Sequence, residues 1–383
     1  MYQNIFIIGA TGQVGRTLIK QVVKNDSAEN HVNPTRIIGL ASRDKVILNT
    51  GGMNAAQLLE MSATREGVLR ALSSGKDIKS MIDISNMAND RGLNGEVVFV
   101  DVTADTERAL EFHQHVITQT DNKIVTANKN PVAKSTFRQF QDLTAYHGRY
   151  SFNTTVMGGA GAVNWLQTRA ELGEKFVQIK GCFSGTLGYI CSRLGESYNN
   201  GEGKMFSEIV KEAKDNGYTE PNPWDDLNGL DVARKLTILA RCVGQSSMLD
   251  SVLVEPFIDE KYSQFSGDEF FQQIKNLDSD ISNTIKWHSF KGQVLRYVAT
   301  ANFSHERGNH PTVTLTVGPE FVEKSSILGQ LNGTSNIMQV TTETHPEKNP
   351  HIIISPGAGL QVTANSIRED LVRLLPHHLK RRK

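Results

Sequence analysis

The chain has 383 residues, enough for two domains that each bury a core of their own. Its 41 lysines and arginines balance 41 aspartates and glutamates, so the zero formal charge excludes the basic footprint of a nucleic-acid-binding protein. Three cysteines without metal-ligand spacing, and no apolar run of about eighteen residues, argue against a disulfide framework and a membrane span. The composition favours a cytoplasmic protein.

The first predicted element is a strand over 3–8, which contains the apolar run IFII. The sequence GATGQVG follows it, and the apolar spacing over 14–25 predicts a helix. Glycines between a strand and a helix allow a tight turn and a close approach of the backbone to a pyrophosphate at the positive helix end. The spacing GxxGxxG also fits an ordinary turn. We interpret it as a dinucleotide site; its candidate residues are Gly9, Thr11, Gly12, Gln13, Val14 and Gly15.

The next elements alternate between strands and helices. Strands are predicted over 35–40 and 96–103, a helix over 106–117, and a strand with its turn over 123–129. Strands that alternate with helices form a parallel sheet through right-handed crossovers. The sequence therefore predicts an α/β fold with a Rossmann-like parallel sheet.

The residue after the second strand of such a sheet selects the cofactor. A carboxylate there binds a ribose 2′-hydroxyl, whereas an arginine favours a 2′-phosphate. Arg43 comes first and Asp44 follows it, so we expect NADP to be preferred and leave NAD open.

Lys129 ends the predicted strand and turn KIVTANK. Ligands bind at the carboxyl ends of the strands in a parallel sheet. Lys129 is therefore a candidate for catalysis, and a simple phosphate contact or a solvated loop charge are the alternatives.

The composition changes near Tyr150, where we expect a second domain to begin. One helix is predicted with Ser207 as its N-cap and Gly217 beyond its end. A second helix is predicted within 227–244. Alternating apolar residues in VLRYVATAN and TVTLTVG predict strands of an antiparallel layer.

The sequence YTEPNPWDDLNGLDVARK, at 218–235, runs from the end of the first of these helices into the second and is rich in charged residues. Its charged residues are Glu220, Asp225, Asp226, Asp231, Arg234 and Lys235. Asp231 and Lys235 are four residues apart and share one helix face, so an exposed ion pair of small energy is one interpretation. The other is a site that binds the ammonium group of a small substrate and holds a lysine ready for proton transfer.

Several of these motifs resemble a known family. The stretch GYTEPNPWDDLNGLDVARK resembles the signature of homoserine dehydrogenases, and KGCFSGTLGYI resembles the segment that precedes it. VTANKNP is similar to the lysine turn of that family, GGAGAV to its glycine-rich hinge, and SPGAGLQVTANSIREDLVRLL to its C-terminal end. The resemblance runs from about Ile5 to Leu375.

The resemblance implies a Rossmann-like parallel-sheet domain plus an α+β domain for substrate binding and dimerisation. Residues 1–152 and 341–383 would form the nucleotide-binding domain, with the C-terminal segment returning to it. Residues 153–340 would form the catalytic and dimerisation domain. The implied activity is the NAD(P)-dependent interconversion of L-aspartate 4-semialdehyde and L-homoserine, in threonine and methionine biosynthesis, by a cytoplasmic homodimer.

The resemblance also implies roles for individual residues. Lys235 and Lys129 would act at the reacting oxygen. The substrate would be held by Glu220, Asp226, Asp231, Tyr218, Gly185 and Thr186. The nucleotide turn would be joined in cofactor binding by Arg43, Thr103, Lys129 and Gly357. A monovalent cation, sodium or potassium, would bind through the backbone at Asn153 and Val156, although the family often has a glutamate where Asn153 stands.

Other classes of protein fit less well. An aspartate-semialdehyde-type dehydrogenase shares the GATG turn but needs a nucleophilic cysteine, and Cys182, Cys191 and Cys242 lack the expected Cys-Thr-Asn surroundings. A short-chain reductase needs a tyrosine four residues before a lysine, and the chain has none. A nucleotide-binding metabolite sensor would have lost a reacting residue, and none is lost. Because the pattern begins near residue 5 and only a short tail follows it, we expect no fused kinase or amino-acid-sensing domain.

Overall fold

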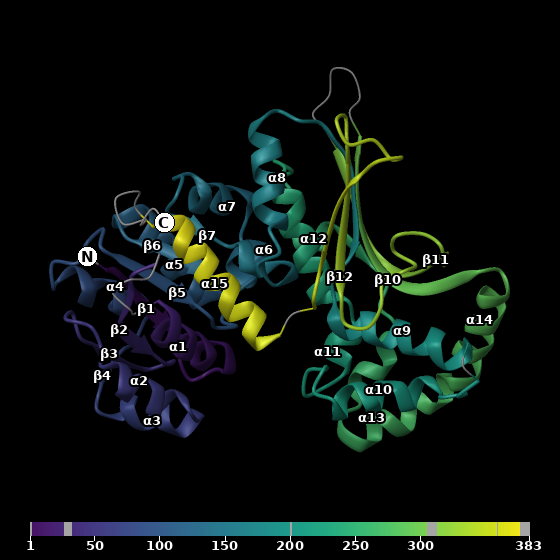
Figure 1. The fold of residues 1–383 in the computed structure, drawn as a ribbon, viewed down its shortest axis with the longest axis horizontal. Helices are drawn as coiled ribbons and strands as arrows, with labels where there is room; N and C mark the ends of the chain where they lie inside the picture. Colours follow the sequence, from purple (N-terminus) through teal and green to yellow (C-terminus); the bar gives the residue numbers. More distant parts are fainter. Residues whose placement is uncertain (1, 27–32, 200, 305–311, 358, 376–383) are drawn as a thin grey trace. The chain divides into compact units, whose positions relative to one another are not determined.

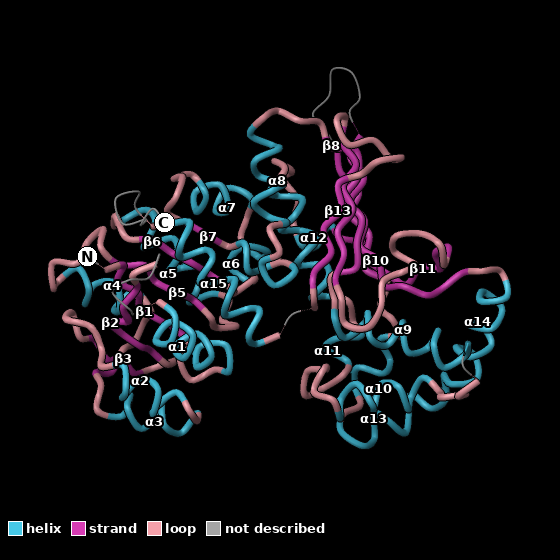
Figure 2. The backbone as a smooth tube through the Cα atoms, viewed as in Figure 1, coloured by secondary structure: helices cyan, strands magenta, loops and turns pink. Residues whose placement is uncertain are grey.

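The computed structural model describes residues 2–26, 33–199, 201–304, 312–357 and 359–375. The chain divides into two compact units, and each has a sheet of its own (Figure 1; Figure 2). Unit 1 comprises residues 1–163 and 359–383, and unit 2 comprises residues 164–358. The first division lies after residue 163 rather than after the expected residue 152, and the second lies after residue 358 rather than after the expected residue 340. At the second division, strand pairing holds residues up to Ser355 in the sheet of unit 2.

Unit 1 contains a seven-stranded sheet in the order β4-β3-β2-β1-β5-β6-β7. Five strands run parallel, which confirms the predicted Rossmann-like sheet: β1 (Gln3–Ile8), β2 (Thr35–Ala41), β5 (Val97–Asp101), β6 (Lys123–Thr126) and β7 (Tyr150–Ser151). The short strands β3 (Lys45–Leu48) and β4 (Lys76–Asp77) add an antiparallel edge that the sequence did not predict.

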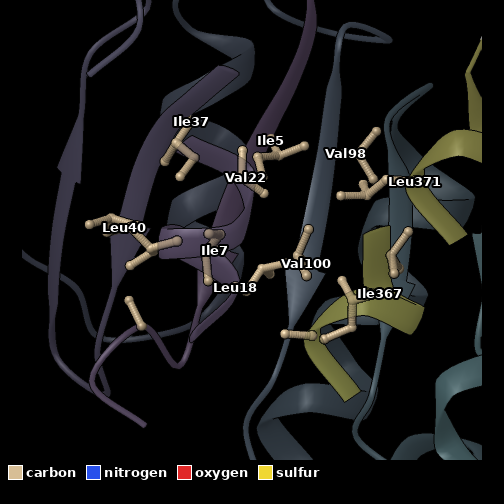
Figure 3. Close-up of a cluster of buried hydrophobic side chains, with 14 of the residues drawn as sticks. Ile5, Ile7, Leu18, Val22, Ile37, Leu40, Val98, Val100, Ile367 and Leu371 are labelled. Atoms are coloured by element: carbon tan, nitrogen blue, oxygen red, sulfur yellow. The ribbon is translucent and has the colours of Figure 1, made fainter. Parts of the chain in front are cut away.

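The helices of unit 1 include a final one that returns from the C-terminal end of the chain. They are α1 (Gln13–Asn25), α2 (Ala55–Ser62), α3 (Arg65–Ser73), α4 (Ile82–Asn89), α5 (Glu107–Gln119), α6 (Asn130–Lys134), α7 (Phe137–Thr144) and α15 (Leu360–Leu374). Helix α15 packs against α1, and its Ile367 and Leu371 join the core beside Ile7 and Val100 (Figure 3). Arg368 of α15 also pairs with the buried Asp26 at 2.7 Å. The C-terminal segment from Gly359 onward thus belongs to unit 1, and the bounds of a nucleotide-binding domain stay a prediction.

Unit 2 contains a six-stranded sheet in the order β13-β12-β8-β10-β11-β9. Its strands are β8 (Phe176–Cys182), β9 (Val252–Val254), β10 (Gln293–Ser304), β11 (Thr312–Glu323), β12 (Asn336–Thr342) and β13 (His351–Ser355). Every pairing is antiparallel except that of β9 with β11, so the predicted antiparallel layer is confirmed.

Most helices of unit 2 lie among residues 185–290, and α9, α12 and α14 pack against β10 (Figure 1). They are α9 (Gly185–Asn199), α10 (Phe206–Asp215), α11 (Trp224–Leu227), α12 (Leu230–Cys242), α13 (Gly267–Ile274) and α14 (Asp278–Phe290), and α8 (Ala162–Glu171) begins at the division between the units. Within the part of the chain that the structure describes, no helix is both long and apolar enough to cross a membrane.

The prediction of Ser207 as a helix N-cap is wrong. Helix α10 begins at Phe206, and Met205 is its N-cap residue. The Ser207 hydroxyl instead donates to the Asp278 carboxylate at 2.7 Å, while Glu208 accepts the Met205 N–H at 2.8 Å. The Ser207 hydroxyl therefore bonds to a residue of another helix, α14, instead of to an N–H group of its own helix.

Candidate functional site

The glycine turn joins β1 to the start of α1. Gly9 has a φ of +88°, in the left-handed region that favours glycine, and its N–H donates to the Ala41 carbonyl at 3.1 Å. The Gly12 N–H donates to the Gly9 carbonyl at 3.0 Å, and α1 begins directly after Gly12. Because the first amides of a helix have no partner within that helix, this turn presents N–H donors at the carboxyl end of β1.

Gly15 allows α1 to approach the turn closely. A Cβ atom at Gly15 would lie 2.6 Å from the Gly9 carbonyl oxygen and 2.9 Å from the Ala10 Cα, distances that real side chains do not adopt. Val14 packs against the core, and the Gln13 carbonyl accepts the Thr17 hydroxyl at 2.8 Å. The second and third glycines therefore have different roles, one at the helix start and one in packing.

A cleft of about 440 Å³ opens over this turn, within the usual size of small-molecule sites. It brings together five predicted cofactor residues: Gly9, Thr11, Gly12, Arg43 and Thr103. The sequence analysis missed four further lining residues with useful side chains: Ser42, Met81, Asp105 and Arg108. They follow different strands, and no local motif marked them.

Asn128 connects the turn after β6 to the wall of this cleft. Its side chain is buried, and its amide donates to the Asp101 carboxylate at 3.0 Å and to the Asp105 carbonyl at 2.8 Å. The Thr103 hydroxyl oxygen is a third acceptor at 3.2 Å. Lys129 follows directly and is the N-cap residue of α6. The backbone that carries Lys129 is thus tied to residues that line this cleft.

Asp101 is the centre of a buried polar chain beneath the cleft. Its carboxylate accepts the Thr103 N–H at 2.8 Å and lies 3.2 Å from His113 Nε2, and His113 Nδ1 lies 2.9 Å from the Tyr150 hydroxyl. Burial favours the neutral acid, but the hydrogen bonds and the charge of His113 outweigh it and hold the pKa of Asp101 below its usual value. Burial raises the pKa of Tyr150. Asp101 therefore stays a charged acceptor for Asn128.

In unit 2, Asp226 lies at the centre of the carboxylate cluster. Its carboxylate accepts the Glu220 N–H at 2.7 Å and the Thr186 hydroxyl at 2.9 Å. Burial raises the pKa of Asp226 to about 6, and the charges of Glu220 and Asp231 act in the same direction against these hydrogen bonds. A desolvated carboxylate of this kind is suited to a ligand that brings a positive charge.

Thr186 and Tyr218 form one wall of this cluster. Thr186 lies in the first turn of α9, and its hydroxyl is 2.6 Å from the Tyr218 carbonyl. The Tyr218 ring is partly exposed and lies 4.9 Å from the Tyr189 ring, measured between centroids. The structure therefore places Thr186, Tyr218, Glu220 and Asp226 close together, and Glu220 and Asp225 are both exposed.

The buried Lys235 forms an ion pair with the half-buried Asp231 on α12. Lys235 Nζ lies 2.8 Å from Asp231 Oδ2 and donates to the Phe183 carbonyl at 2.6 Å. Only 9 % of Lys235 is exposed. Lys235 is therefore shielded from water while the Asp231 side chain is 35% exposed, so the pair differs from a surface pair that leaves both charges in water.

Gly185 and Gly357 both lie against Thr334 in unit 2. A Cβ atom at Gly357 would lie 2.0 Å from the Thr334 carbonyl oxygen, and one at Gly185 would lie 3.3 Å from it. Gly185 starts α9 beside Thr186, next to the carboxylate cluster. Gly357 belongs by structure to unit 2, so its predicted role in cofactor binding stays a prediction, and packing already requires a glycine there.

Asn153 and Val156 belong to a short buried segment that includes η1 (Asn153–Thr155). The Asn153 amide donates to the Gly159 carbonyl at 3.2 Å, but its Oδ1 is buried without a hydrogen-bond partner in the described part of the chain. The Val156 carbonyl accepts the Gly159 N–H at 3.0 Å. Across the described residues, no group of three or more His, Cys, Asp or Glu side chains has a metal-binding arrangement. An unsatisfied buried oxygen suits a hard cation.

The parallel sheet with its glycine turn and cleft, together with the carboxylate cluster of unit 2, defines a two-domain α/β protein of the Rossmann type. Residues 162–372 match the family described as homoserine dehydrogenase. The chain belongs to the homoserine dehydrogenase family, a family of oxidoreductases, as its motifs predicted.

Two relatives and one solved structure illustrate the match. The chain is 33% identical over 380 residues to bifunctional aspartokinase/homoserine dehydrogenase 2, chloroplastic, of Zea mays, which covers 96% of this chain and 38% of that protein. It is 32% identical over 291 residues to the homoserine dehydrogenase of Paracoccidioides brasiliensis, with 73% and 75% covered. A hyperthermophilic archaeal homoserine dehydrogenase in complex with NADPH has a TM-score of 0.69 at 20% identity, with 97% of each chain covered, and supports the fold. The chain thus spans less than two fifths of the length of the plant relative.

Proposed function

We propose that the protein catalyses the NAD(P)-dependent interconversion of L-aspartate 4-semialdehyde and L-homoserine, a step of threonine and methionine biosynthesis. The observation that carries the proposal is the pair of buried Lys235 and half-buried Asp231 within electrostatic range of Asp226, in a chain of this family. A desolvated carboxylate and a fixed lysine match a substrate that has an ammonium group at one end and a reacting oxygen at the other.

The carboxylates would bind the substrate ammonium group. Asp226 is the first candidate, because its pKa of about 6 leaves it ionised at neutral pH although it is half-buried. Glu220 and Asp231 would add negative charge beside it, and Thr186, Tyr218 and Gly185 would shape the pocket wall. A charge-assisted hydrogen bond in such a place is stronger than one in water.

Lys235 would act at the reacting oxygen. Two acceptors, Asp231 Oδ2 and the Phe183 carbonyl, fix its ammonium group, so its donors have a defined direction. When bound, the nicotinamide supplies or accepts the hydride. In the reducing direction the lysine would stabilise the charge that develops on the oxygen and donate a proton to it; in the oxidising direction a proton leaves that oxygen. Lys129, in unit 1, is the second candidate for this proton transfer.

The cofactor would bind in the cleft of unit 1, with NADP preferred over NAD. Arg43 lines that cleft directly after β2, where a cation suits a 2′-phosphate. The turn supplies N–H donors for the pyrophosphate at Thr11 and at the start of α1, while Gly9 and Gly12 let the backbone approach the pyrophosphate closely. The NADPH in the archaeal structure agrees with this preference.

An aspartate-semialdehyde-type activity receives no support from the cysteines. Such an enzyme needs a reactive thiolate, but burial raises the pKa of Cys182 and of Cys191 to about 12, and raises that of Cys242 as well. All three are buried free thiols, which also fits the reducing environment of the cytoplasm.

A monovalent cation and a second copy of the chain would complete the protein. The orphaned Asn153 Oδ1 and the nearby backbone, including Val156, would supply oxygen ligands for sodium or potassium.

Val177, Leu253 and Ile354 are large apolar side chains on strands of unit 2 that are 46%, 66% and 62% exposed. Exposed apolar side chains on the strands of this sheet suit a homodimer interface.

The direct test mixes the purified protein with L-homoserine and either NADP or NAD, in sodium and in potassium buffers, and follows reduced nicotinamide by absorbance. We expect homoserine-dependent reduction that is faster with NADP. Faster reduction with NAD would keep the activity and overturn the cofactor preference. No reduction with either cofactor, in a folded protein, would favour a metabolite sensor.

A further inference from the structure

We propose that Arg108 is a second arginine that binds the 2′-phosphate of NADP together with Arg43. The selection of NADP would then depend on two guanidinium groups from separate turns. This inference rests on the proposed cofactor, but it concerns a residue that neither the sequence motifs nor the family match singled out.

The sheet order brings these two arginines to one cleft. Arg43 follows β2 and Arg108 lies in the first turn of α5, the helix that follows β5, and both strands pair with β1 on its two sides. Since the three strands are parallel, their carboxyl ends lie at the same edge, over the glycine turn. Both side chains line the cleft of unit 1, although they are 65 residues apart in the sequence.

A hydrogen bond fixes Arg108 against Arg43. Arg108 Nη2 donates to the Arg43 carbonyl oxygen at 2.8 Å. The backbone of Arg108 is also fixed, because its N–H donates to Asp105 Oδ1 at 3.0 Å at the start of α5. The guanidinium group is therefore held beside the residue that follows β2, where the ribose 2′-position binds in this type of fold.

The chemistry of this pair suits a phosphate better than a hydroxyl. A guanidinium group carries five N–H donors in a planar fork, so one bond to a carbonyl leaves room for a bidentate phosphate contact. Arg108 lies in the first turn of α5, where the helix dipole adds positive potential. A 2′-phosphate brings about two negative charges, which match two cations, whereas a 2′-hydroxyl gains little from a second one.

Among the described residues that line this cleft, Asp105 is the one carboxylate, and it opposes the phosphate only weakly. Its Oδ1 accepts the N–H groups of Arg108 at 3.0 Å and of Ala109 at 3.3 Å, so it acts as the cap of α5. The cleft therefore has two arginines and one carboxylate, and that carboxylate already accepts hydrogen bonds from the first turn of α5.

The test compares two nucleotides that differ only in the 2′-phosphate. Adenosine 2′,5′-bisphosphate and adenosine 5′-monophosphate are titrated by calorimetry into the full-length wild type, Arg108→Gln and Arg43→Gln. We expect Arg108→Gln to weaken the bisphosphate by about 10- to 100-fold and the monophosphate by less than about 3-fold. Arg138→Gln is the control, since Arg138 lies on α7 in an exposed pair with Asp142, and it should match the wild type.

Two outcomes would overturn the inference. Equal weakening of both nucleotides by Arg108→Gln would assign Arg108 to adenine binding or to packing, and no weakening of either would remove it from the site. Arg108→Lys, which keeps the charge and loses the fork, should fall between Gln and wild type, and it serves if the Gln variant does not fold. Because the titration measures binding without turnover, its result can be interpreted even if the protein does not oxidise homoserine.

Discussion

The ammonium group of Lys235 lies 2.8 Å from the Asp231 carboxylate, in a pair that is mostly shielded from water. On an exposed helix such a pair contributes a few tenths of a kcal/mol. Burying two charges costs several kcal/mol, which their attraction repays only with favourable geometry, so a buried pair is weak support for a role in stability. We therefore interpret the Asp231–Lys235 pair as part of the reaction site.

Replacing Lys235 should abolish most of the activity. Lys235→Met removes the group proposed to exchange a proton with the reacting oxygen, so kcat for homoserine oxidation should fall by about 10²- to 10⁴-fold. Lys211→Met is the matched control, because Lys211 forms an exposed pair with Asp215 at 2.9 Å on α10, also four residues apart. The control should stay within about twofold of wild type. A Lys235→Met protein that is folded by circular dichroism and keeps a tenth of kcat would remove Lys235 from the mechanism.

The ionised Asp226 should lower the stability of the folded protein at neutral pH while it provides a charge for binding a ligand. Its pKa is about 6 in the folded protein against 3.8 ordinarily, so the folded state binds the proton more tightly than the unfolded state. Its contribution to stability is therefore greatest at acid pH and is lost as pH rises through about 6. Asp226→Asn should raise the free energy of unfolding at pH 7.5 by about 1–3 kcal/mol, and the difference should vanish below about pH 4.

Urea unfolding of both proteins at the two pH values measures this difference. The Asn amide has suitable partners, since its oxygen replaces the acceptor of the Glu220 N–H and its N–H can donate to Thr186 while Thr186 donates to the Tyr218 carbonyl. A variant that is less stable than wild type at pH 7.5 would show that Asp226 is stabilised by its neighbours rather than held ready for a ligand.

Asn128 should affect both stability and turnover. Asn128→Ala leaves Asp101 and the Asp105 carbonyl without their amide donor, which should cost about 1–3 kcal/mol of unfolding free energy. It also loosens the turn that carries Lys129, so kcat should fall further than the KM for homoserine rises. Asn130→Ala, which removes a more exposed bond to the Ala104 carbonyl, is the control and should change little. Unchanged kcat in Asn128→Ala would limit Asn128 to a structural role.

The glycine turn should tolerate no side chain at Gly15. Gly15→Ala places a Cβ atom 2.6 Å from a backbone oxygen, so α1 must shift, at a cost of about 1–3 kcal/mol. The shift should also weaken the binding of adenosine 2′,5′-bisphosphate. Gly195→Ala, inside α9 with open space around it, should instead stabilise the protein by about 0.5–1 kcal/mol. Thermal unfolding of the two variants provides the comparison, and similar shifts in both would contradict close packing at Gly15.

Local patterns in the sequence predicted the elements that depend on neighbouring residues. The strand, glycine turn and helix around Gly9 follow from periodicity and turn chemistry, and the helical spacing of Asp231 and Lys235 placed them on one face. The burial that separates a reaction site from a surface pair depends on elements elsewhere in the chain, such as the carbonyl of Phe183. No local pattern in the sequence carries that information.

The features that sequence reasoning missed are all formed between distant segments. Arg108 reaches the cofactor cleft through the neighbouring positions of β1, β2 and β5, and no motif marks it. Ser207 has the residue type of an N-cap, yet Asp278 from α14 takes its hydroxyl. The edge strands β3 and β4 are too short to show a period.

The central claim is that the carboxylate cluster binds an ammonium group while the lysine acts at the oxygen. It is tested most directly by comparing the NADP-dependent oxidation of L-homoserine and 4-hydroxybutanoate, which has the same alcohol and no amine. Wild type should prefer homoserine by at least about 10²-fold in kcat/KM, and Asp226→Asn should lose most of that preference. Equal oxidation of both alcohols by wild type, or an undiminished preference in the variant, would contradict the account.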